Sequence, residues 1–434
     1  MSKEGYSVLV VCSPSPISGG GSLRAFRSLR EYVKYFKTFL FIPWGLWSNR
    51  KDLQESMSYL RELGESGVKF AGFSQLPEVI SKLGKVLGTR VFETLLSLMI
   101  PNITRFKIGV SNYDAVIALH EGWDAVYGGS VLAKFFNVPN MVLLHDPPFY
   151  GSKERFLNIM KAVFLSRILA SSTTLERVLS EVESSILNIS EYYLNKLRYE
   201  KLLRDYDVVI GVTKATAIEM GGEWLDKMIY FDPGVSLDEG DLEIIKNIRG
   251  KTKEKRDYVV FGGRPTTKKG LFEALISFKI ISNHFSGIKL FITGKIPSRT
   301  LLRTRMVCRR LGIEDKVIFT GFLSREKRFE VVAKAKLMLY PSHVDAFSYA
   351  VLESLHLGTP VIAYRIPALE IYYGGASGVE LVDEWNLESF TVKAIDILEK
   401  GVEVIEPPKI KSWDEIMNDE VRIVQKLITT GKST

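Results

Sequence analysis

The sequence predicts an α/β protein made of two Rossmann-like domains, each with a parallel sheet covered by helices. The chain has 434 residues, which is too many for one ordinary hydrophobic core and fits two domains. Short, almost continuously apolar runs alternate with stretches of helical period, a pattern typical of parallel strands buried on both faces. The alternation falls into two series, separated by a charged stretch over 246–257 that we predict to be a linker.

The first domain is predicted over 1–245. It begins with the apolar run YSVLVVC, which indicates a strand, and continues through a glycine-rich turn into a helix that starts near Leu23. Further apolar runs of strand length follow, separated by stretches of helical period. These runs lie at 38–44, 68–73, 114–120, 140–146 and 207–213.

Two segments of the first domain, 77–109 and 152–200, do not follow the alternation. Both have a helical period, are rich in Leu, Ile, Val and Phe, and carry scattered basic residues. We interpret them as helical insertions that pack on the core of the first domain. The alternative interpretation is a basic amphipathic surface that docks on anionic lipid.

The second domain is predicted over 258–405. Its strands are expected at apolar runs separated by helices, which gives it a sheet of its own. These runs lie at 258–263, 289–294, 316–322, 336–342 and 360–364. The remaining residues, 406–434, contain a helical pattern over 410–428, and we expect this helix to pack back against the first domain.

Composition restricts the class of protein and of partner. The chain is 46% hydrophobic, and no stretch approaches the ~18 to 20 consecutive apolar residues of a membrane span. The first apolar run is too short for a signal peptide, and Cys12 and Cys308 match no metal-binding spacing, so we expect a cytoplasmic protein. The net charge of +8 favours anionic partners such as phosphates or a membrane surface. Nucleic acid is not expected, because no signature of a nucleic-acid-binding module is present.

The candidate ligand site of the second domain begins with two carboxylates near one helix. This helix is predicted from about Phe347 to Leu357, with Gly358 ending it. It is apolar around most of its circumference, so the carboxylate of Glu353 is costly there unless a donor or a ligand binds it. Asp345 precedes Glu353 by eight residues, which is ~12 Å along a helix axis and roughly spans a pyrophosphate. The plainer interpretation makes Asp345 a helix cap and Glu353 a half-exposed helix residue.

A second loop of the same predicted sheet carries cations. The stretch FGGRPTTKKG, over 261–270, follows a strand and opens a helix, and Gly262 and Gly263 allow a tight turn. Arg264 and Lys269 bring two positive charges to the carboxyl ends of the strands, where open α/β sheets bind ligands. Both side chains suit a phosphate. Two loops of one sheet with ligand chemistry favour a diphosphate site over two unrelated solvated turns.

These motifs resemble those of a known family, the retaining GT-B glycosyltransferases of family four, also called glycosyl transferases group one. The family's G-R-x(4)-K-G signature is matched at Gly263, Arg264, Lys269 and Gly270. Its E-x(7)-E signature is matched at Asp345 and Glu353, with Asp in place of the first Glu. The continuation LESLHLGTPVIAY is similar to the family's LEAMACGxPVVA, and the resemblance is strongest over about 256–366.

The resemblance implies a GT-B fold with two facing Rossmann-like domains and a retaining, metal-independent glycosyltransferase that needs no cofactor. Such an enzyme moves a sugar from a nucleotide-diphosphate donor to a hydroxyl acceptor. We expect the acceptor to be a lipid-linked glycan or a polysaccharide precursor, which would place the protein in the cytoplasm or on the inner membrane face.

The resemblance also implies a role for each site residue of the second domain. Arg264 and Lys269 are expected to contact the diphosphate, and Glu353 is expected to bind the ribose. The transferred sugar is expected to meet Asp345, Ala346, Phe347 and Ser348, and the base is expected beside Gly321 and Phe322. The residues expected to take part in catalysis are Arg264, Lys269, Asp345 and, in the first domain, His145.

In the first domain, the glycine-rich turn supplies one group of candidates. In resembling enzymes this turn lies at the cleft near the donor phosphate and the acceptor, a role that falls here to Gly19, Gly20 and Gly21. Arg24, on the following helix, is expected to reach an acceptor phosphate. The turn lacks the G-x-G-x-x-G spacing of a dinucleotide site, which disfavours a dehydrogenase.

The strand ends of the first domain supply the other candidates. The resemblance places a histidine near the donor sugar, and His145 is the candidate, although a local turn network with Asp146 explains the same residues equally well. His120 and Glu121 end the preceding strand and are candidates for shaping the acceptor pocket.

Two alternatives remain open at this stage. Asp345 is one methylene shorter than the usual Glu, and Ala346 stands where the family has Gly. These departures are compatible with altered sugar selectivity or with a non-catalytic partner subunit that only binds the nucleotide sugar. Within the enzyme class, a transferase acting on a small soluble sugar phosphate competes with one acting on a lipid-linked acceptor.

Overall fold

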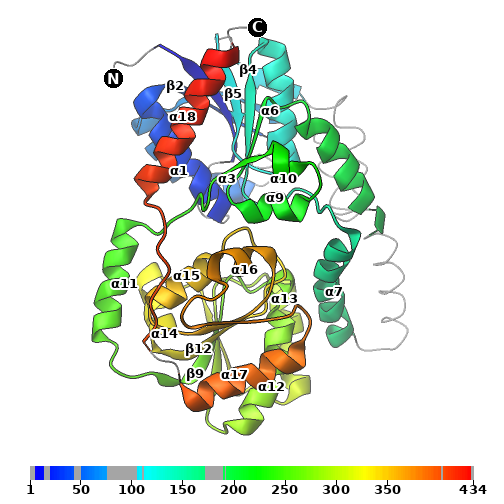
Figure 1. Cartoon of the computed structure of the whole chain (residues 1–434), viewed down its shortest axis with the longest axis vertical. Coiled ribbons are helices and arrows are strands. Elements are labelled where there is room, and N and C mark those ends of the chain that lie inside the picture. Colours follow the sequence, from blue (N-terminus) through cyan, green and yellow to red (C-terminus); the bar gives the residue numbers. More distant parts are fainter. Residues whose placement is uncertain are drawn as a thin grey trace. The chain divides into compact units, whose positions relative to one another are not determined.

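The structure of the protein is a computed structural model that describes residues 5–13, 20–43, 50–75, 105–109, 112–171, 189–190, 192–401 and 404–431. These residues form two compact units, each with its own sheet (Figure 1). Unit 1 comprises Met1–Gly151, Glu191–Val235 and Ser412–Thr434, and unit 2 comprises Ser152–Ser190 and Ser236–Lys411. The predicted fold class, two α/β domains with parallel sheets, is confirmed.

Unit 1 is built on an eight-stranded sheet. Its strands are β1 (Ser7–Val11), β2 (Lys37–Ile42), β3 (Lys69–Gln75), β4 (Arg105–Ile108), β5 (Ala115–Ala118), β6 (Asn140–Leu144), β7 (Val208–Gly211) and β8 (Ile229–Tyr230). The order is β4-β3-β2-β1-β5-β6-β7-β8, and the pairs are parallel except for β3 with β4. The central strands β1, β5 and β6 are almost entirely buried, because helices cover both faces, and they therefore appear in the sequence as continuous apolar runs.

Helices pack on this sheet and bring the C-terminal end of the chain back to it. They include α1 (Gly20–Tyr35), α3 (Arg50–Glu65), α6 (Trp123–Phe136), α9 (Lys214–Met220), α10 (Trp224–Lys227) and α18 (Trp413–Gly431). The last helix, α18, packs against α1 and β6 (Figure 1, red beside blue). The expectation that the C-terminal helix returns to the first domain is confirmed.

A buried ion pair joins α18 to α1. The guanidinium of Arg24 pairs with the carboxylate of Glu420, and both side chains are completely buried. Tyr32 on α1 donates a second hydrogen bond to Glu420. The other donors of Arg24 are also used, since Nε donates to the Gly234 carbonyl at 2.8 Å and Nη1 to the Ser28 hydroxyl at 2.6 Å. The pair is therefore fully desolvated and satisfied, which is the condition under which a buried charge is tolerated.

Unit 2 is built on a six-stranded sheet with the order β11-β10-β9-β12-β13-β14, in which the pairs are all parallel. Its strands are β9 (Arg256–Phe261), β10 (Lys289–Thr293), β11 (Val317–Gly321), β12 (Ala335–Tyr340), β13 (Val361–Tyr364) and β14 (Val379–Val382). Its helical elements include α7 (Lys153–Ala170), α11 (Glu239–Lys251), the short 3-10 helix η1 (Thr267–Lys269), α12 (Leu271–His284), α13 (Ser298–Leu311), α14 (Arg325–Lys334), α15 (Tyr349–His356), α16 (Pro367–Tyr373) and α17 (Leu387–Lys400).

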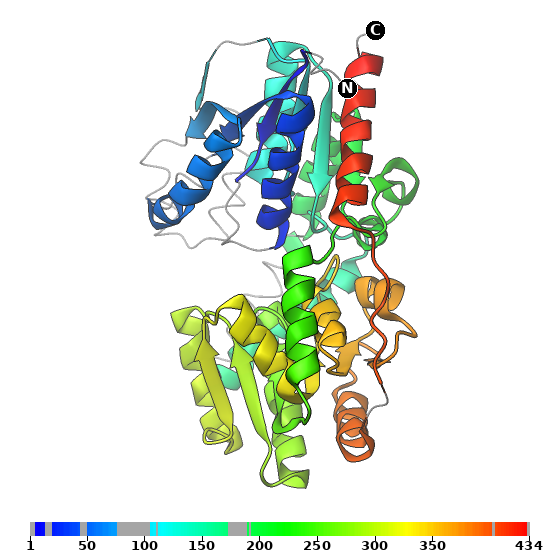
Figure 2. The ribbon, with the colours of Figure 1, turned by 90° about the vertical axis from the view of Figure 1, so that its left-hand side faces the viewer.

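The structure corrects the predicted linker over 246–257. These residues form the second half of α11 and the start of β9, and unit 2 begins earlier, at Ser236. Helix α11 packs on α14 and α15, and Figure 2 shows its ribbon beside them. Glu243, Lys246 and Lys251 are exposed, whereas Asp241, Ile245 and Ile248 are buried. A run of charged residues on an amphipathic helix resembles a linker in sequence when few residues of that helix are buried.

The structure also corrects the assignment of 152–200 to the first domain: 152–190 belong to unit 2, whereas 191–200 belong to unit 1 as predicted. Helix α7 belongs to unit 2, where it packs on η1, α12 and α13. Its buried apolar side chains include Phe156, Ile159 and Met160, which contribute to the packing of α7 within unit 2. Of the other segment, 77–109, only β4 and the residue after it are among the described residues. In the described part of the chain, no helix is both long and apolar enough to cross a membrane.

We predict that Glu420→Gln destabilises unit 1 by about 3–5 kcal/mol, because the charge of Arg24 is left buried without a counter-ion. Urea denaturation followed by circular dichroism measures the loss. The matched control is Arg422→Gln on the same helix, since that guanidinium is 77% exposed and its replacement should cost about 0.5 kcal/mol or less. Equal effects of the two substitutions would contradict the anchoring role of the buried pair.

Candidate functional site

The carboxyl ends of β9 and β12 bring two of the predicted site residues together. Lys269, on the loop after β9, places Nζ 2.9 Å from Oδ2 of Asp345, on the loop after β12. Lys269 also donates to the Val344 carbonyl at 2.6 Å. Because β9 and β12 are neighbouring parallel strands, their carboxyl ends lie at one edge of the sheet, as expected for a ligand site of an open α/β sheet.

A tyrosine that sequence reasoning missed completes this pair. The Tyr340 hydroxyl donates to Oδ2 of Asp345, the same oxygen that contacts Lys269. Burial, together with the negative charge of Asp345, raises the pKa of Tyr340 well above its ordinary value, so the hydroxyl keeps its proton and remains a donor. A tyrosine at the end of an apolar strand carries no sign of this role, because core tyrosines occupy the same position.

Glycines allow the two loops to approach closely. Gly263 and Gly270 have φ angles of +80° and +76°, which residues other than glycine rarely adopt. A Cβ on Gly270 would lie only 1.9 Å from the carbonyl oxygen of Pro341, and a Cβ on Gly262 would lie 2.5 Å from the ring of Tyr340. The glycines of the predicted signature are thus required by the packing of the β9 loop against the end of β12.

The second predicted carboxylate, Glu353, lies on the buried face of α15. Arg328 of α14 binds it through both guanidinium nitrogens, with Nη2 2.9 Å from Oε1. Glu353 was expected to need a donor, and Arg328 supplies it in the described structure, although no sequence rule points to an arginine 25 residues earlier. The helix itself begins at Tyr349, and the Ser348 hydroxyl caps it by accepting from the Val351 N–H at 3.3 Å.

The remaining predicted residues of unit 2 lie on loops at the same edge. Ala346 and Phe347 are buried, and the Phe347 ring packs on Tyr372 and Tyr373. Arg264 is exposed on the β9 loop. Gly321 ends the edge strand β11 with a φ of +67°, and the side chain of Phe322 after it is 83% exposed. An exposed aromatic ring at this position is available to stack on a flat ligand group.

In unit 1, the predicted residues meet at the carboxyl ends of β5 and β6. The backbone N–H of His145 donates to Oε2 of Glu121 at 3.2 Å, and its Nδ1 lies 3.5 Å from the same oxygen. The rings of His120 and His145 are 5.8 Å apart. Gly21, in the first turn of α1, is so close that a Cβ there would lie 3.0 Å from the His145 ring. Gly20 begins α1, and Gly19 lies outside the described residues.

Burial and the neighbouring charges determine the protonation states of Glu121 and His145. Burial alone would raise the pKa of Glu121, but His120 and His145 outweigh it and hold the pKa of this carboxyl below its ordinary value. Burial lowers the pKa of His145. An ionised Glu121 beside a neutral His145 is therefore the expected state near neutral pH, and a neutral imidazole can exchange a hydrogen bond with a hydroxyl.

The structure does not place Arg24 where an acceptor phosphate could reach it. Its guanidinium is completely buried against Glu420, Ser28 and the Gly234 carbonyl. The prediction failed because the partner, Glu420, lies almost four hundred residues away in the sequence, where no local pattern connects the two.

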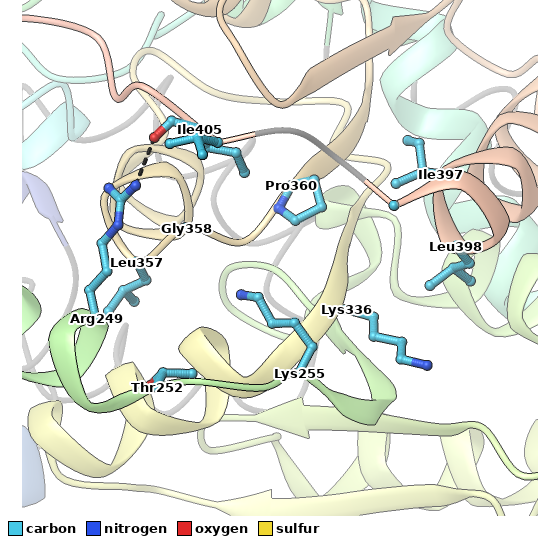
Figure 3. Close-up of a pocket in the computed structure, with 12 residues that line it drawn as sticks. Arg249, Thr252, Lys255, Lys336, Leu357, Gly358, Pro360, Ile397, Leu398 and Ile405 are labelled. Atoms are coloured by element: carbon cyan, nitrogen blue, oxygen red, sulfur yellow. Dashed lines mark hydrogen bonds between the residues drawn. The ribbon is translucent and has the colours of Figure 1, made fainter.

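A cavity of about 520 Å³ in unit 2 lies away from these residues. Its lining includes Lys255, Lys336 and Pro360, at or just before the amino ends of β9, β12 and β13, and Arg249 of α11 (Figure 3). Arg249 is held there by a 2.9 Å hydrogen bond to the Ile405 carbonyl. The predicted site therefore lies at the opposite edge of the sheet from this cavity.

Comparison with known families finds a similarity over the residues of the carboxyl-edge site. Residues 244–406 match the family model of glycosyl transferases group 1, and this range contains every predicted site residue of unit 2. This part of unit 2 is therefore similar to the glycosyl transferases group 1, as the sequence motifs indicate.

Similarity beyond the matched residues extends over both units. An uncharacterized glycosyltransferase of Methanocaldococcus jannaschii is 24% identical over 341 residues, which are 73% of this chain and 76% of that protein. Sucrose-phosphate synthase of Thermosynechococcus elongatus has a TM-score of 0.64 at 13% identity and covers 98% of this chain and 100% of its own. Anabaena HepE, solved in complex with UDP-glucose, has a TM-score of 0.54 at 14% identity and covers 97% of this chain and 99% of its own. The fold shared with these two solved structures is GT-B, as the resemblance implied.

We predict that Gly270→Ala destabilises unit 2 by at least about 2 kcal/mol, because a Cβ there meets a backbone carbonyl in a disfavoured conformation. Thermal and urea unfolding measure the effect. Gly287→Ala is the matched control, since a Cβ at Gly287 meets nothing within 4 Å and should be neutral or slightly stabilising. A neutral Gly270→Ala would show that the two loops are not packed as described.

Proposed function

We propose that the protein is a retaining glycosyltransferase that moves a sugar from a nucleotide-diphosphate donor to a hydroxyl of an acceptor. The observation that carries the proposal is the meeting of Lys269 with Asp345, 2.9 Å apart, at the carboxyl edge of a domain similar to the glycosyl transferases group 1. Lys269 is 15% exposed and Asp345 is 9% exposed, so both charges are held at fixed positions before a ligand arrives. Charged groups that are preorganised in this way need little rearrangement when a ligand binds, which lowers the free-energy cost of binding.

The cations of the site are proposed to neutralise the donor diphosphate. Lys269 pairs with Asp345 and donates to the Val344 carbonyl, and its third hydrogen bond, to the Tyr340 hydroxyl, is long at 3.5 Å. A phosphate oxygen can replace this weakest of the three contacts. Arg264, on the same loop, is exposed and can approach a phosphate with its planar fork. The first N–H groups of α15 add partial positive charge beside Ser348. Two cations and a helix terminus supply the charge that a metal ion would otherwise provide, so we propose transfer without a metal or cofactor.

Glu353 is proposed to bind the ribose hydroxyls, and Asp345 to Ser348 to bind the transferred sugar. The carboxylate of Glu353 has two oxygens with several lone pairs, and Arg328 occupies only part of this accepting capacity. In the loop from Asp345 to Ser348, which is proposed to bind the sugar, the side chains of Ala346 and Phe347 are buried. Their packing in the core holds the backbone of this loop in place.

The transfer step is proposed to proceed on one face of the sugar. The acceptor oxygen forms a bond to the anomeric carbon while the bond from that carbon to the diphosphate oxygen breaks. The acceptor proton passes to the leaving diphosphate, whose negative charge Arg264 and Lys269 stabilise. Configuration is retained because attack and departure take place on the same face, and no protein nucleophile is required.

The acceptor is proposed to be a lipid-linked glycan or polysaccharide precursor, met by the residues of unit 1. His145, Glu121 and Gly21 form a compact cluster at the carboxyl ends of β5 and β6. The neutral imidazole of His145 is suited to a sugar hydroxyl. Such an acceptor would bring the protein to the cytoplasmic face of a membrane, and flotation with anionic and neutral vesicles tests this association directly.

We predict that one of UDP, GDP, ADP or dTDP raises the melting temperature of unit 2 and that Arg264→Ala and Glu353→Gln abolish the shift. Ligand binding to the folded state raises apparent stability by RT ln(1 + [L]/Kd), about 2.7 kcal/mol at a hundredfold excess over Kd. Arg309→Ala on α13 is the matched control, because its side chain is 73% exposed and should leave the shift intact. Loss of the shift in the control, or its survival in both site variants, would refute the site.

Turnover separates the enzyme from the partner-subunit alternative, which Asp345 and Ala346 leave open. A panel of nucleotide sugars, including UDP-glucose, is incubated with a polyprenyl-linked acceptor and, separately, with soluble sugar phosphates. Transfer to one of the two acceptors identifies the acceptor class. Nucleotide binding without transfer to either would favour a non-catalytic subunit.

A further inference from the structure

Helix α7 reaches the domain of the candidate site from outside the residues that match the family model. It spans Lys153–Ala170, whereas the match covers 244–406, yet α7 is part of unit 2 and packs on η1, the element that carries Lys269. The start of the helix is fixed by the Ser152 hydroxyl, which accepts from the Arg155 N–H at 3.1 Å. The side chain of Arg155 therefore leaves α7 from its first turn.

His343, two residues before Asp345, is completely buried between two carboxylates. Its Nε2 lies 2.9 Å from Oε1 of Glu273, on α12, and its Nδ1 lies 2.6 Å from Oε1 of Glu384, after β14. The ring of Trp385 stacks on the imidazole with centroids 4.5 Å apart. The imidazole is thus held on both edges and on one face.

Helix α7 closes this arrangement from the other side. Nη1 of Arg155 binds the two oxygens of Glu384 at 3.0 and 2.9 Å, and Nη2 donates to the His343 carbonyl at 2.6 Å. The indole N–H of Trp385 donates to the Asn158 carbonyl, also on α7, at 3.1 Å. Trp385 has a φ of +71°, a conformation that a bulky residue keeps only where its surroundings hold it.

The same arrangement reaches both members of the Lys269–Asp345 pair. The backbone N–H of His343 donates to the Lys268 carbonyl at 3.0 Å, which ties the β12 loop to η1. Lys269 in turn donates to the Val344 carbonyl at 2.6 Å. A shift of His343 therefore moves the residues that flank the pair on both loops.

We propose that Arg155 and His343 are positioning residues, which hold the loop from Ser342 to Asp345 so that Lys269 and Asp345 keep the geometry that binds the nucleotide sugar. This inference rests on the proposed function. It makes the donor site depend on a helix outside the matched domain. We call the four side chains Arg155, Glu273, His343 and Glu384 the α7 clamp.

The stability of the α7 clamp should depend on pH, because one of its members, His343, can gain or lose a proton. Burial alone would lower the pKa of His343, but its bonds to Glu273 and Glu384 outweigh burial and raise the pKa above the ordinary value of about 6.5. The other groups that face the imidazole are Arg155, the ring of Trp385 and the Tyr364 ring, 5.2 Å away on β13. With His343 protonated, two cations balance two carboxylates. As the pH rises through the pKa of folded His343, one carboxylate loses its donor and the stabilisation is lost.

The first test compares Arg155→Met with Lys161→Met, an exposed lysine on the same helix. Arg155→Met should raise KM for the nucleotide sugar and Kd for the nucleotide about tenfold, and Lys161→Met should leave both unchanged. Arg155→Lys, which keeps the charge but not the fork, should recover part of the loss. Equal KM values for Arg155→Met and Lys161→Met would overturn the proposal.

The second test measures nucleotide affinity between pH 6 and 9 in the unchanged protein and in His343→Gln. Affinity of the unchanged protein should fall above the pKa of His343, relative to the variant, because glutamine does not titrate. The comparison removes the titration of the nucleotide itself, which is the same for both. Parallel pH profiles would overturn the role given to His343.

A third measurement needs no ligand and separates this inference from the proposed function. Hydrogen exchange of the loop from Ser342 to Asp345 should be at least about tenfold faster in Arg155→Met than in Lys161→Met, because local opening is easier when the α7 clamp is broken. Faster exchange in a protein that binds no nucleotide would refute the proposed function and retain the clamp. Unchanged exchange would refute the clamp, whatever the nucleotide data show.

Discussion

The ion pair between Lys269 and Asp345 ties together two loops that leave neighbouring strands, and the surrounding packing of unit 2 keeps those loops in place. Gly270 allows η1 to lie against the Pro341 carbonyl, and Tyr340 holds the inner oxygen of the carboxylate. The two charges face each other in a partly buried position, where each makes the other tolerable. The fold therefore fixes the ammonium of Lys269 before any ligand binds, and a pre-positioned cation of this kind lowers the cost of binding an anionic group.

The order and type of most elements followed from the sequence because parallel α/β sheets give a strong pattern. Buried strands such as β1, β5 and β6 appear as almost unbroken apolar runs, and the glycine after α15 lies where the sequence predicts the end of that helix. The pattern failed where burial is one-sided. The second half of α11 resembles a linker, because Ile248 is buried there among residues that are mostly exposed and polar.

The candidate site could be predicted to the extent that its residues lie on loops next to strand ends. The sequence predicts Lys269, Asp345 and His145 at the carboxyl ends of strands, and the structure places them there and brings Lys269 and Asp345 into contact. The partner residues Tyr340, Arg328 and Arg155 were not found, because a tyrosine or an arginine on an ordinary helix or strand gives no sign of what it contacts. The prediction for Arg24 failed for a different reason. Its neighbours in sequence suggest a ligand-binding arginine, but its guanidinium is buried in an ion pair with Glu420, 396 residues later.

The division of the chain between the units has a consequence for biosynthesis. The chain passes from one unit to the other at Gly151, at Ser190, at Val235 and at Lys411, so neither unit is continuous in sequence. While the chain emerges from the ribosome, Arg24 in α1 is made first, and the carboxylate of Glu420 follows only 396 residues later. Until then the core of unit 1 lacks the anion that makes a buried guanidinium tolerable, so unit 1 is expected to reach its final packing only after Glu420 has been made. Any ribosome-bound fragment that stops before Ser412 should consequently be recognised as incomplete by chaperones or proteases.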